Sequence, residues 1–193
     1  RQAIALKPEL VQAHYNLGST LKKLGRLEEA LVSYTQAISL KPDLVQAHNN
    51  LGSALKELGR FDDAKASYKR AIALKPDFAE AQNNLGGTLK KLGRFDDALA
   101  CFNQAIALKP DFAMAYNNLG NTLKELGRID DALACYNKAI ALKPDFAEAQ
   151  NNLGSTLKEL GRLDDALACY KQAIALKPDY AEAQNNMGNA LVE

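Results

Sequence analysis

Apolar residues recur along the chain in two stripes, and the pair of stripes repeats every 34 residues. In the stretch 79–112, Ala81, Leu85, Leu89 and Leu92 are spaced four, four and three residues apart, which is the spacing of one helix face. The second stripe of the same stretch consists of Phe95, Ala98, Leu99, Phe102, Ala105 and Ile106. Each 34-residue unit is therefore predicted to contain two amphipathic helices.

Glycine and proline mark the ends of these helices. All six prolines occupy one position of the unit, and eleven of the twelve glycines occupy two others, with only Gly87 outside them. Gly93 stands where the first helix needs a residue that tolerates left-handed dihedral angles, and Pro110 prevents the second helix from continuing. Asp111 is expected to cap the helix that follows. The pattern predicts helix, tight turn, helix.

The repetition extends over the whole chain. Residues 75–108 and 143–176 are identical at 29 of 34 positions. Repeats of this period are stacked units that bury their apolar faces against each other, so we expect a single solenoid over residues 1–193. Its predicted parts are the end of a second helix at 1–10, complete units at 11–44, 45–78, 79–112, 113–146 and 147–180, and a lone first helix at 181–193. Because the chain begins at Arg1 and ends within a unit, we expect a fragment of a longer protein.

The units resemble the tetratricopeptide repeat (TPR). The residues of the third unit that match its motif are Leu85, Gly86, Ala98, Phe102, Ala105 and Pro110. The resemblance implies an all-α fold, a right-handed superhelix of tandem helix-turn-helix units. It also implies that first helices line an inner, concave groove in which such proteins bind their partners.

Two columns of asparagine run along the predicted groove face, one with a member on every first helix and the other with a member on all but the first. The column that we name after Asn84 contains Asn16, Asn50, Asn84, Asn118, Asn152 and Asn186. The column that we name after Asn83 contains Asn49, Asn83, Asn117, Asn151 and Asn185. A carboxamide both donates and accepts hydrogen bonds, so regularly spaced amides can hold an extended peptide backbone with little regard for its side chains. The alternative is that these side chains bond locally or bridge neighbouring units.

The Asn84 column also resembles the repeat superhelix of O-GlcNAc transferases, in which asparagines at the equivalent position bind the backbone of extended protein substrates. This resemblance implies a substrate-recognition segment of a larger, glycosyltransferase-like enzyme. It covers only the repeats, because the 193 residues contain no glycosyltransferase domain.

A third column on the same helices is cationic and consists of Lys22, Lys56, Lys90, Lys124 and Lys158. These lysines could attract acidic ligands, although Glu57, Glu125 and Glu159 lie beside them, and solvated alternating charge is the alternative. An RNA-binding protein would place such lysines on phosphates and the asparagines on bases. The net charge of +1 and the absence of an aromatic column on this face argue against nucleic acid.

No pattern in the sequence indicates an enzyme, a cofactor or a metal site. His14 and His48 share a position that holds Gln or Tyr in other units, which favours packing or hydrogen bonding. Cys101, Cys135 and Cys169 also share one position, and equivalent neighbouring helices should lie about 10 Å apart, beyond the ~7 Å Cα limit for a disulfide. Free thiols favour an intracellular, cytoplasmic location.

Two further expectations concern membranes and self-association. No apolar stretch approaches the ~18 residues of a membrane-spanning helix, so membrane insertion is not expected. The half-units at 1–10 and 181–193 are complementary, and we expect that two molecules can dock head to tail through them. The preferred interpretation remains a noncatalytic scaffold that binds a protein or extended peptide.

Overall fold

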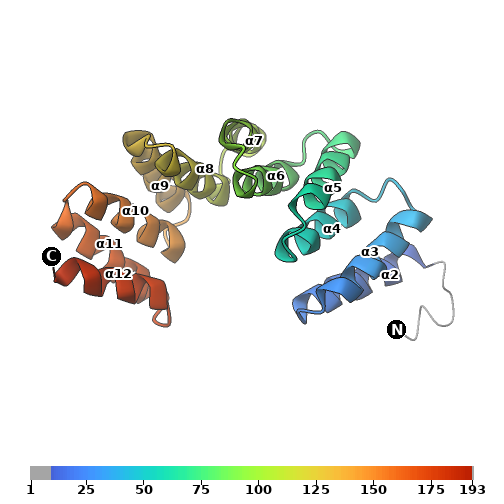
Figure 1. The fold of residues 1–193 in the computed structure, drawn as a ribbon, viewed down its shortest axis with the longest axis horizontal. Coiled ribbons are helices and arrows are strands. Elements are labelled where there is room, and N and C mark those ends of the chain that lie inside the picture. Colours follow the sequence, from blue (N-terminus) through green and yellow to red (C-terminus); the bar gives the residue numbers. More distant parts are fainter. Residues whose placement is uncertain (1–9, 193) are drawn as a thin grey trace. The chain divides into compact units, whose positions relative to one another are not determined.

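The computed structural model describes residues 10–192, and every element within this range is a helix (Figure 1). First helices of 13 residues alternate with second helices of 14 residues. The final helix, α12, is a first helix of 11 residues. The first helices are α2 (Val11–Lys23), α4 (Val45–Glu57), α6 (Ala79–Lys91), α8 (Ala113–Glu125), α10 (Ala147–Glu159) and α12 (Ala181–Leu191). The second helices are α3 (Leu27–Leu40), α5 (Phe61–Leu74), α7 (Phe95–Leu108), α9 (Ile129–Leu142) and α11 (Leu163–Leu176).

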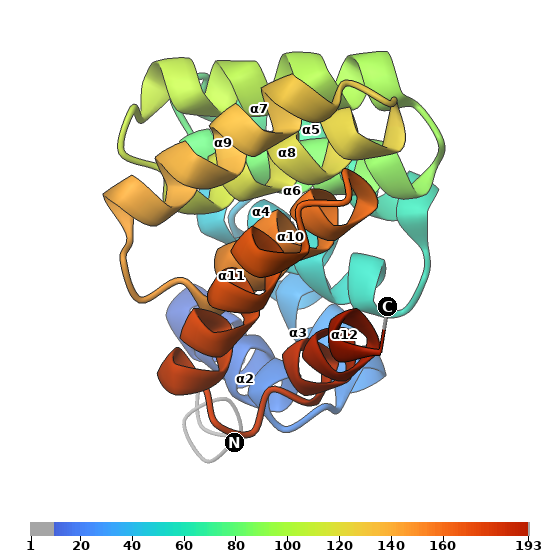
Figure 2. The ribbon, with the colours of Figure 1, turned by 90° about the vertical axis from the view of Figure 1, so that its left-hand side faces the viewer.

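The chain divides into two compact units, one ending at Leu108 and the other beginning at Lys109. In the first unit α3 contacts both α2 and α4, and in the second unit α11 contacts both α10 and α12 (Figure 2). The predicted all-α solenoid of paired helices is confirmed. That residues 1–193 form one continuous solenoid stays a prediction. The predicted helix end at 1–10 lies outside the described residues, except for Leu10.

Glycine closes each tight turn between the paired helices, as predicted. Gly93 has a φ of 72°, in the left-handed region that only glycine adopts without strain. Its N–H donates to the carbonyl of Lys90 at 3.0 Å, and the N–H of Arg94 donates to the carbonyl of Leu89 at 2.9 Å. These two bonds form a Schellman motif, which satisfies carbonyls at the end of α6 and reverses the chain into α7.

The expectation that Asp111 caps the following helix is wrong. The N-cap residue of α8 is Phe112, and no side chain bonds to the helix end there. The same arrangement begins α10, where the N-cap Phe146 is only 7% exposed and packs against Ala113, Ala139 and Ala149. The N-cap position thus holds a large apolar residue, and the aspartate stands one position too early to cap the helix.

The two helices of one 34-residue repeat approach each other closely at a glycine. A Cβ atom built on Gly86 would lie 2.8 Å from Cε1 of Phe102, which is fully buried on α7. The ring therefore occupies the space that a side chain at this position would need. The neighbouring Gly87 is different, because a Cβ atom there would meet nothing within 4 Å.

Candidate functional site

The first helices of each unit form one face, and this face carries the predicted site residues. Within the first unit α4 contacts α2 and α6, and within the second α10 contacts α8 and α12. Most of the Asn84 column lies half-buried on this face, whereas Asn16 is exposed. The side chain of Asn16 accepts a hydrogen bond from Gln12 at 2.8 Å. The side chains of the Asn84 column are thus at least partly exposed.

Asparagines of successive first helices are joined by side-chain hydrogen bonds. The Nδ2 of Asn84 donates to Oδ1 of Asn49 at 3.1 Å. In the second unit Asn152 donates to Asn117 and Asn186 donates to Asn151, both at 2.9 Å. Each bond joins residues 35 positions apart, one repeat plus one residue. The predicted bridging of neighbouring repeats is therefore present, and it fixes the orientation of the donor amides.

Three members of the Asn83 column are buried more deeply than their neighbours in the Asn84 column. Asn83, Asn117 and Asn151 are 4%, 6% and 1% exposed. The Nδ2 of Asn151 donates to the carboxylate of Glu182 at 3.1 Å, while its Oδ1 accepts from Asn186. Buried amides with satisfied hydrogen bonds stabilise the contact between repeats. The assignment of both columns to ligand binding stays a prediction.

Two supporting residues were not recognised in the sequence. Tyr15 occupies the Asn83 column in the first repeat, and its hydroxyl accepts a hydrogen bond from Nδ2 of Asn50 at 3.0 Å. Thr88 is fully buried and its hydroxyl donates to the main-chain carbonyl of Asn84 at 2.9 Å. The identical Asn-x3-Thr spacing in several repeats was a signal that could have identified the threonine.

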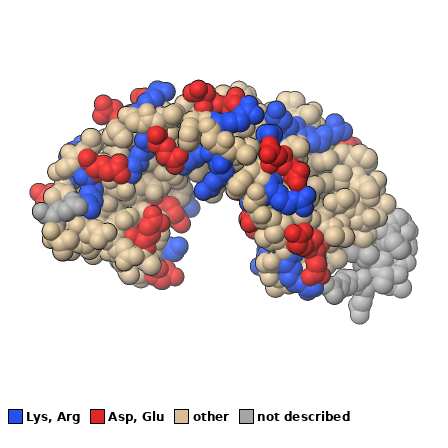
Figure 3. All heavy atoms as spheres, viewed as in Figure 1, with Lys and Arg blue, Asp and Glu red and all other residues tan. Residues whose placement is uncertain are grey.

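Two members of the lysine column are paired with acidic residues. Lys22 lies 3.0 Å from the carboxylate of Glu57, and Lys124 lies 2.7 Å from Glu159. Lys124 also donates to the hydroxyl of Ser155 at 3.0 Å. Lys90 and Lys158 are half-buried on α6 and α10. Figure 3 shows basic and acidic side chains interspersed over the face that it draws, so charge is mixed rather than gathered in one patch.

The histidines and acidic residues provide no metal site within residues 10–192. No group of three or more His, Cys, Asp or Glu side chains could hold a metal ion in this part of the chain. The Nε2 of His48 lies 2.9 Å from the carbonyl oxygen of Pro42, and Gln184 makes the equivalent bond to Pro178 at 2.8 Å. The shared position therefore contacts the loop before α4 and before α12. None of the described helices is long and apolar enough to cross a membrane.

The three cysteines are free and half-buried on the second helices. Burial raises the pKa of Cys135 to about 11, and the carboxylate of Asp131 adds to the shift. Burial and the nearby Asp165 likewise raise the pKa of Cys169. Because the thiolate is the reactive form, these cysteines are poorly suited to act as nucleophiles at neutral pH.

We expect Cys135 to react slowly with iodoacetamide in the variant Cys101→Ser/Cys169→Ser. At pH 8 the rate should be about tenfold below that of an exposed cysteine, because the smaller thiolate fraction outweighs its greater nucleophilicity. The logarithm of the rate should rise linearly up to about pH 10, which mass spectrometry of timed samples would measure. A plateau near pH 9 would contradict the raised pKa.

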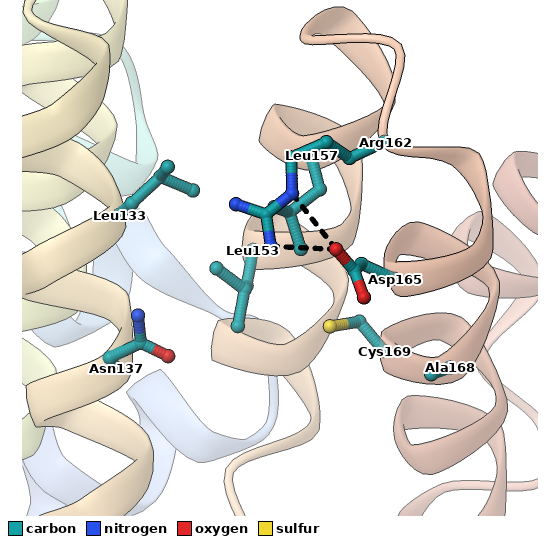
Figure 4. A pocket seen from close by; sticks show the side chains of 8 residues that line it. All are labelled: Leu133, Asn137, Leu153, Leu157, Arg162, Asp165, Ala168 and Cys169. Carbon is teal, nitrogen blue, oxygen red and sulfur yellow. Dashed lines mark hydrogen bonds and ion pairs between the residues drawn. The ribbon is translucent and has the colours of Figure 1, made fainter.

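A hollow with equivalent lining positions occurs in each of the two compact units. In the second unit it lies between α9, α10 and α11, and its lining is Leu133, Asn137, Leu153, Leu157, Arg162, Asp165, Ala168 and Cys169 (Figure 4). In the first unit the lining is Leu31, Thr35, Leu51, Leu55, Arg60, Asp63, Ala66 and Ser67, the same positions three repeats earlier. The hollow is therefore a product of repeat stacking and does not indicate a site of its own.

Comparison with models of protein families finds matches along most of the chain. Residues 18–59, 120–161 and 154–193 match a family model described as TPR repeat. Residues 49–111 and 101–134 match two further models described as tetratricopeptide repeat. No curated protein matches the chain significantly.

Several solved structures are similar along nearly their whole length. YrrB, described as a TPR protein with an unusual peptide-binding site, is 25% identical over 95% of this chain and 95% of its own, with a TM-score of 0.67. MamA is 27% identical over 91% of this chain and 96% of its own, with a TM-score of 0.71. A thermophilic TPR protein of Thermus thermophilus is 26% identical over 95% of this chain and 100% of its own, with a TM-score of 0.81.

Proposed function

The chain belongs to the tetratricopeptide repeat family, and from this premise we propose that it binds an extended segment of a partner protein along the face formed by its first helices. The amides of the Asn84 column contact the peptide backbone, and hydrogen bonds to Asn49, Asn117 and Asn151 hold three of them in place. The chain thus acts as a protein-interaction scaffold.

The observation that carries the proposal is the orientation of the Asn84 column. Asn84, Asn152 and Asn186 each use an N–H to bond to the preceding repeat. An amide has a second N–H and an oxygen with two lone pairs, so each side chain keeps a donor and an acceptor for a ligand. Because the first bond already orients the amide, little side-chain entropy is lost when a peptide binds.

The spacing of these amides suits an extended peptide. Packed helices lie about 8–10 Å apart, and an extended chain advances about 3.3 Å per residue. Within each unit, one asparagine therefore meets a peptide about every three residues. Contacts to backbone groups at this interval make affinity the sum of many modest bonds and impose little sequence preference. YrrB, whose peptide-binding site is called unusual, is a TPR protein of similar fold.

A nucleic-acid ligand is less well supported. An RNA-binding face would need lysines available for phosphates. Lys22 and Lys124 are instead paired with glutamates on the next first helix. A role as the substrate-recognition segment of a glycosyltransferase-like enzyme is compatible with peptide binding, and the partner of the chain then would be that enzyme's protein substrate.

The proposal is tested by two matched sets of alanine substitutions and an array of random peptides of about 15 residues, long enough to span several asparagines. The first set is Asn84→Ala, Asn152→Ala and Asn186→Ala. The second set is Asn49→Ala, Asn117→Ala and Asn151→Ala. Both sets break the same three hydrogen bonds, and the second set also removes the bond from Asn151 to Glu182. Only the first set removes amides that the proposal places against the ligand.

We expect the first set to weaken binding of the peptides chosen by the unmodified chain at least about tenfold. The second set should weaken their binding less. Circular dichroism confirms that both variants remain helical. Equal losses in the two sets would show that the asparagines only bridge repeats. If a homopolymeric RNA binds instead, with affinity that falls steeply between about 50 and 200 mM salt, the ligand is nucleic acid.

A further inference from the structure

Lys56 lacks the partners that Lys124 has. Lys124 contacts Ser155 and Glu159, which follow it by 31 and 35 residues. The residues at the same distances after Lys56 are Gly87 and Lys91. One therefore has no side chain and the other carries the same charge as Lys56. No ion-pair partner of Lys56 lies within residues 10–192, although this lysine is half-buried on α4.

The preceding repeat shows what normally surrounds such a lysine. A hollow between α2 and α4 is lined by Ser19, Lys22, Lys23, Tyr34, Asn50 and Glu57. Lys22 and Glu57 form an ion pair across it. One repeat later, the position of Glu57 holds Lys91, and the position of Asn50 holds Asn84. The carboxylate that completes the pair is thus missing between α4 and α6, while a member of the Asn84 column remains beside it.

The electrostatics around Lys56 agree with a missing anion. Burial lowers the pKa of Lys56, the neighbouring carboxylate of Glu57 opposes this, and the charges of Lys22 and Lys91 lower it further. Glu57 is already engaged by Lys22 at 3.0 Å. A negative group placed between Lys56 and Lys91 would relieve the repulsion between them, and space is present because a Cβ atom on Gly87 meets nothing within 4 Å.

An unsatisfied donor lies in the same repeat. The hydroxyl of Tyr68 is buried and has no hydrogen-bond partner within the described residues. Its counterpart Tyr34 donates to Ser19 at 3.3 Å and lines the hollow between α2 and α4. A buried hydroxyl without an acceptor is costly in free energy, so this repeat differs from the preceding one in its polar contacts.

We propose that Lys56 and Lys91 bind the carboxylate of an aspartate or glutamate in the bound segment, in the space left by Gly87. The ligand supplies the acidic group that Glu57 and Glu159 supply in other repeats. This inference rests on the proposed peptide-binding function and adds to it one position of side-chain preference, on the first unit. Binding is otherwise through the peptide backbone.

The test selects random peptides of about 12 residues displayed on phage with four proteins: the unmodified chain, Lys56→Gln, Gly87→Ser/Lys91→Glu and Lys124→Gln. The double substitution restores both partners found around Lys124. The variant Lys124→Gln is the matched control, because its lysine already has Glu159 and Ser155. We expect one position of the peptides selected by the unmodified chain and by Lys124→Gln to be enriched in Asp and Glu. The other two variants should lose this enrichment.

Synthetic peptides then measure the contribution directly. Changing the enriched Asp or Glu to Asn or Gln should weaken binding to the unmodified chain about tenfold, which is about 1.4 kcal/mol, and should not weaken binding to Gly87→Ser/Lys91→Glu. Enrichment that persists in Lys56→Gln would overturn the inference. So would selected peptides without an acidic position that still need the Asn84 column, and in that case the proposed function stands. A chain that selects no peptide would overturn both.

Discussion

Replacing Gly86 with alanine should destabilise the protein, whereas the same change at the adjacent Gly87 should stabilise it. A Cβ atom added at Gly86 would lie 2.8 Å from the fully buried ring of Phe102, and one added at Gly87 would meet nothing within 4 Å. Overpacking a core costs about 1–3 kcal/mol. Alanine in a helix interior gains roughly 0.5–1 kcal/mol over glycine at either position. The difference between the two variants therefore isolates the packing cost, because the helix-propensity gain cancels.

Urea unfolding followed by circular dichroism measures this difference. The midpoint of Gly86→Ala should lie below that of the unmodified chain, and the midpoint of Gly87→Ala should lie above it. The double change Gly86→Ala/Phe102→Leu is a further control, because a smaller side chain opposite the new methyl group should recover part of the loss. If both single variants have the same midpoint, the close approach of α6 and α7 does not restrict the size of the side chain at position 86.

Much of this fold could be predicted from the sequence because its determinants are local. Apolar stripes with helical spacing gave the paired helices, and the position of Gly93 gave the left-handed residue of the turn, which has a φ of 72°. The expectation at Asp111 failed by one residue. An aspartate is a good N-cap, but in α8 the N-cap position holds Phe112 and the aspartate stands just before it.

The candidate site was predicted less completely, for a geometric reason. Helix spacing places Asn84 and Lys56 on the face formed by the first helices, since each conclusion depends on one helix alone. Which residue each one contacts depends on the displacement of neighbouring helices along each other. The contacts join residues 35 apart, as in Asn84 with Asn49 and Lys124 with Glu159. A repeat of 34 residues does not reveal the extra residue, so the sequence placed glutamates beside the lysine column without showing which lysine each one pairs with.

The same contacts predict that Asn151→Ala loosens the last described helix, α12. Asn151 is 1% exposed, and both of its side-chain bonds go to α12, one to Glu182 at 3.1 Å and one from Asn186 at 2.9 Å. Hydrogen bonds of this kind contribute about 0.5–1.5 kcal/mol each, more where one partner is charged, and truncation also leaves a cavity. We expect a loss of about 2 kcal/mol from the docking of this helix.

In a stack whose repeats contact only their neighbours, this loss stays local. Amide hydrogens in residues 181–191 should exchange about 30-fold faster in Asn151→Ala, while those of α8 and α9 should change little. Hydrogen exchange with mass spectrometry of peptic fragments measures both regions in one experiment. Asn185→Ala is the matched control, because Asn185 belongs to the same column but is exposed on α12. Faster exchange throughout the second unit would instead mean that its helices unfold together.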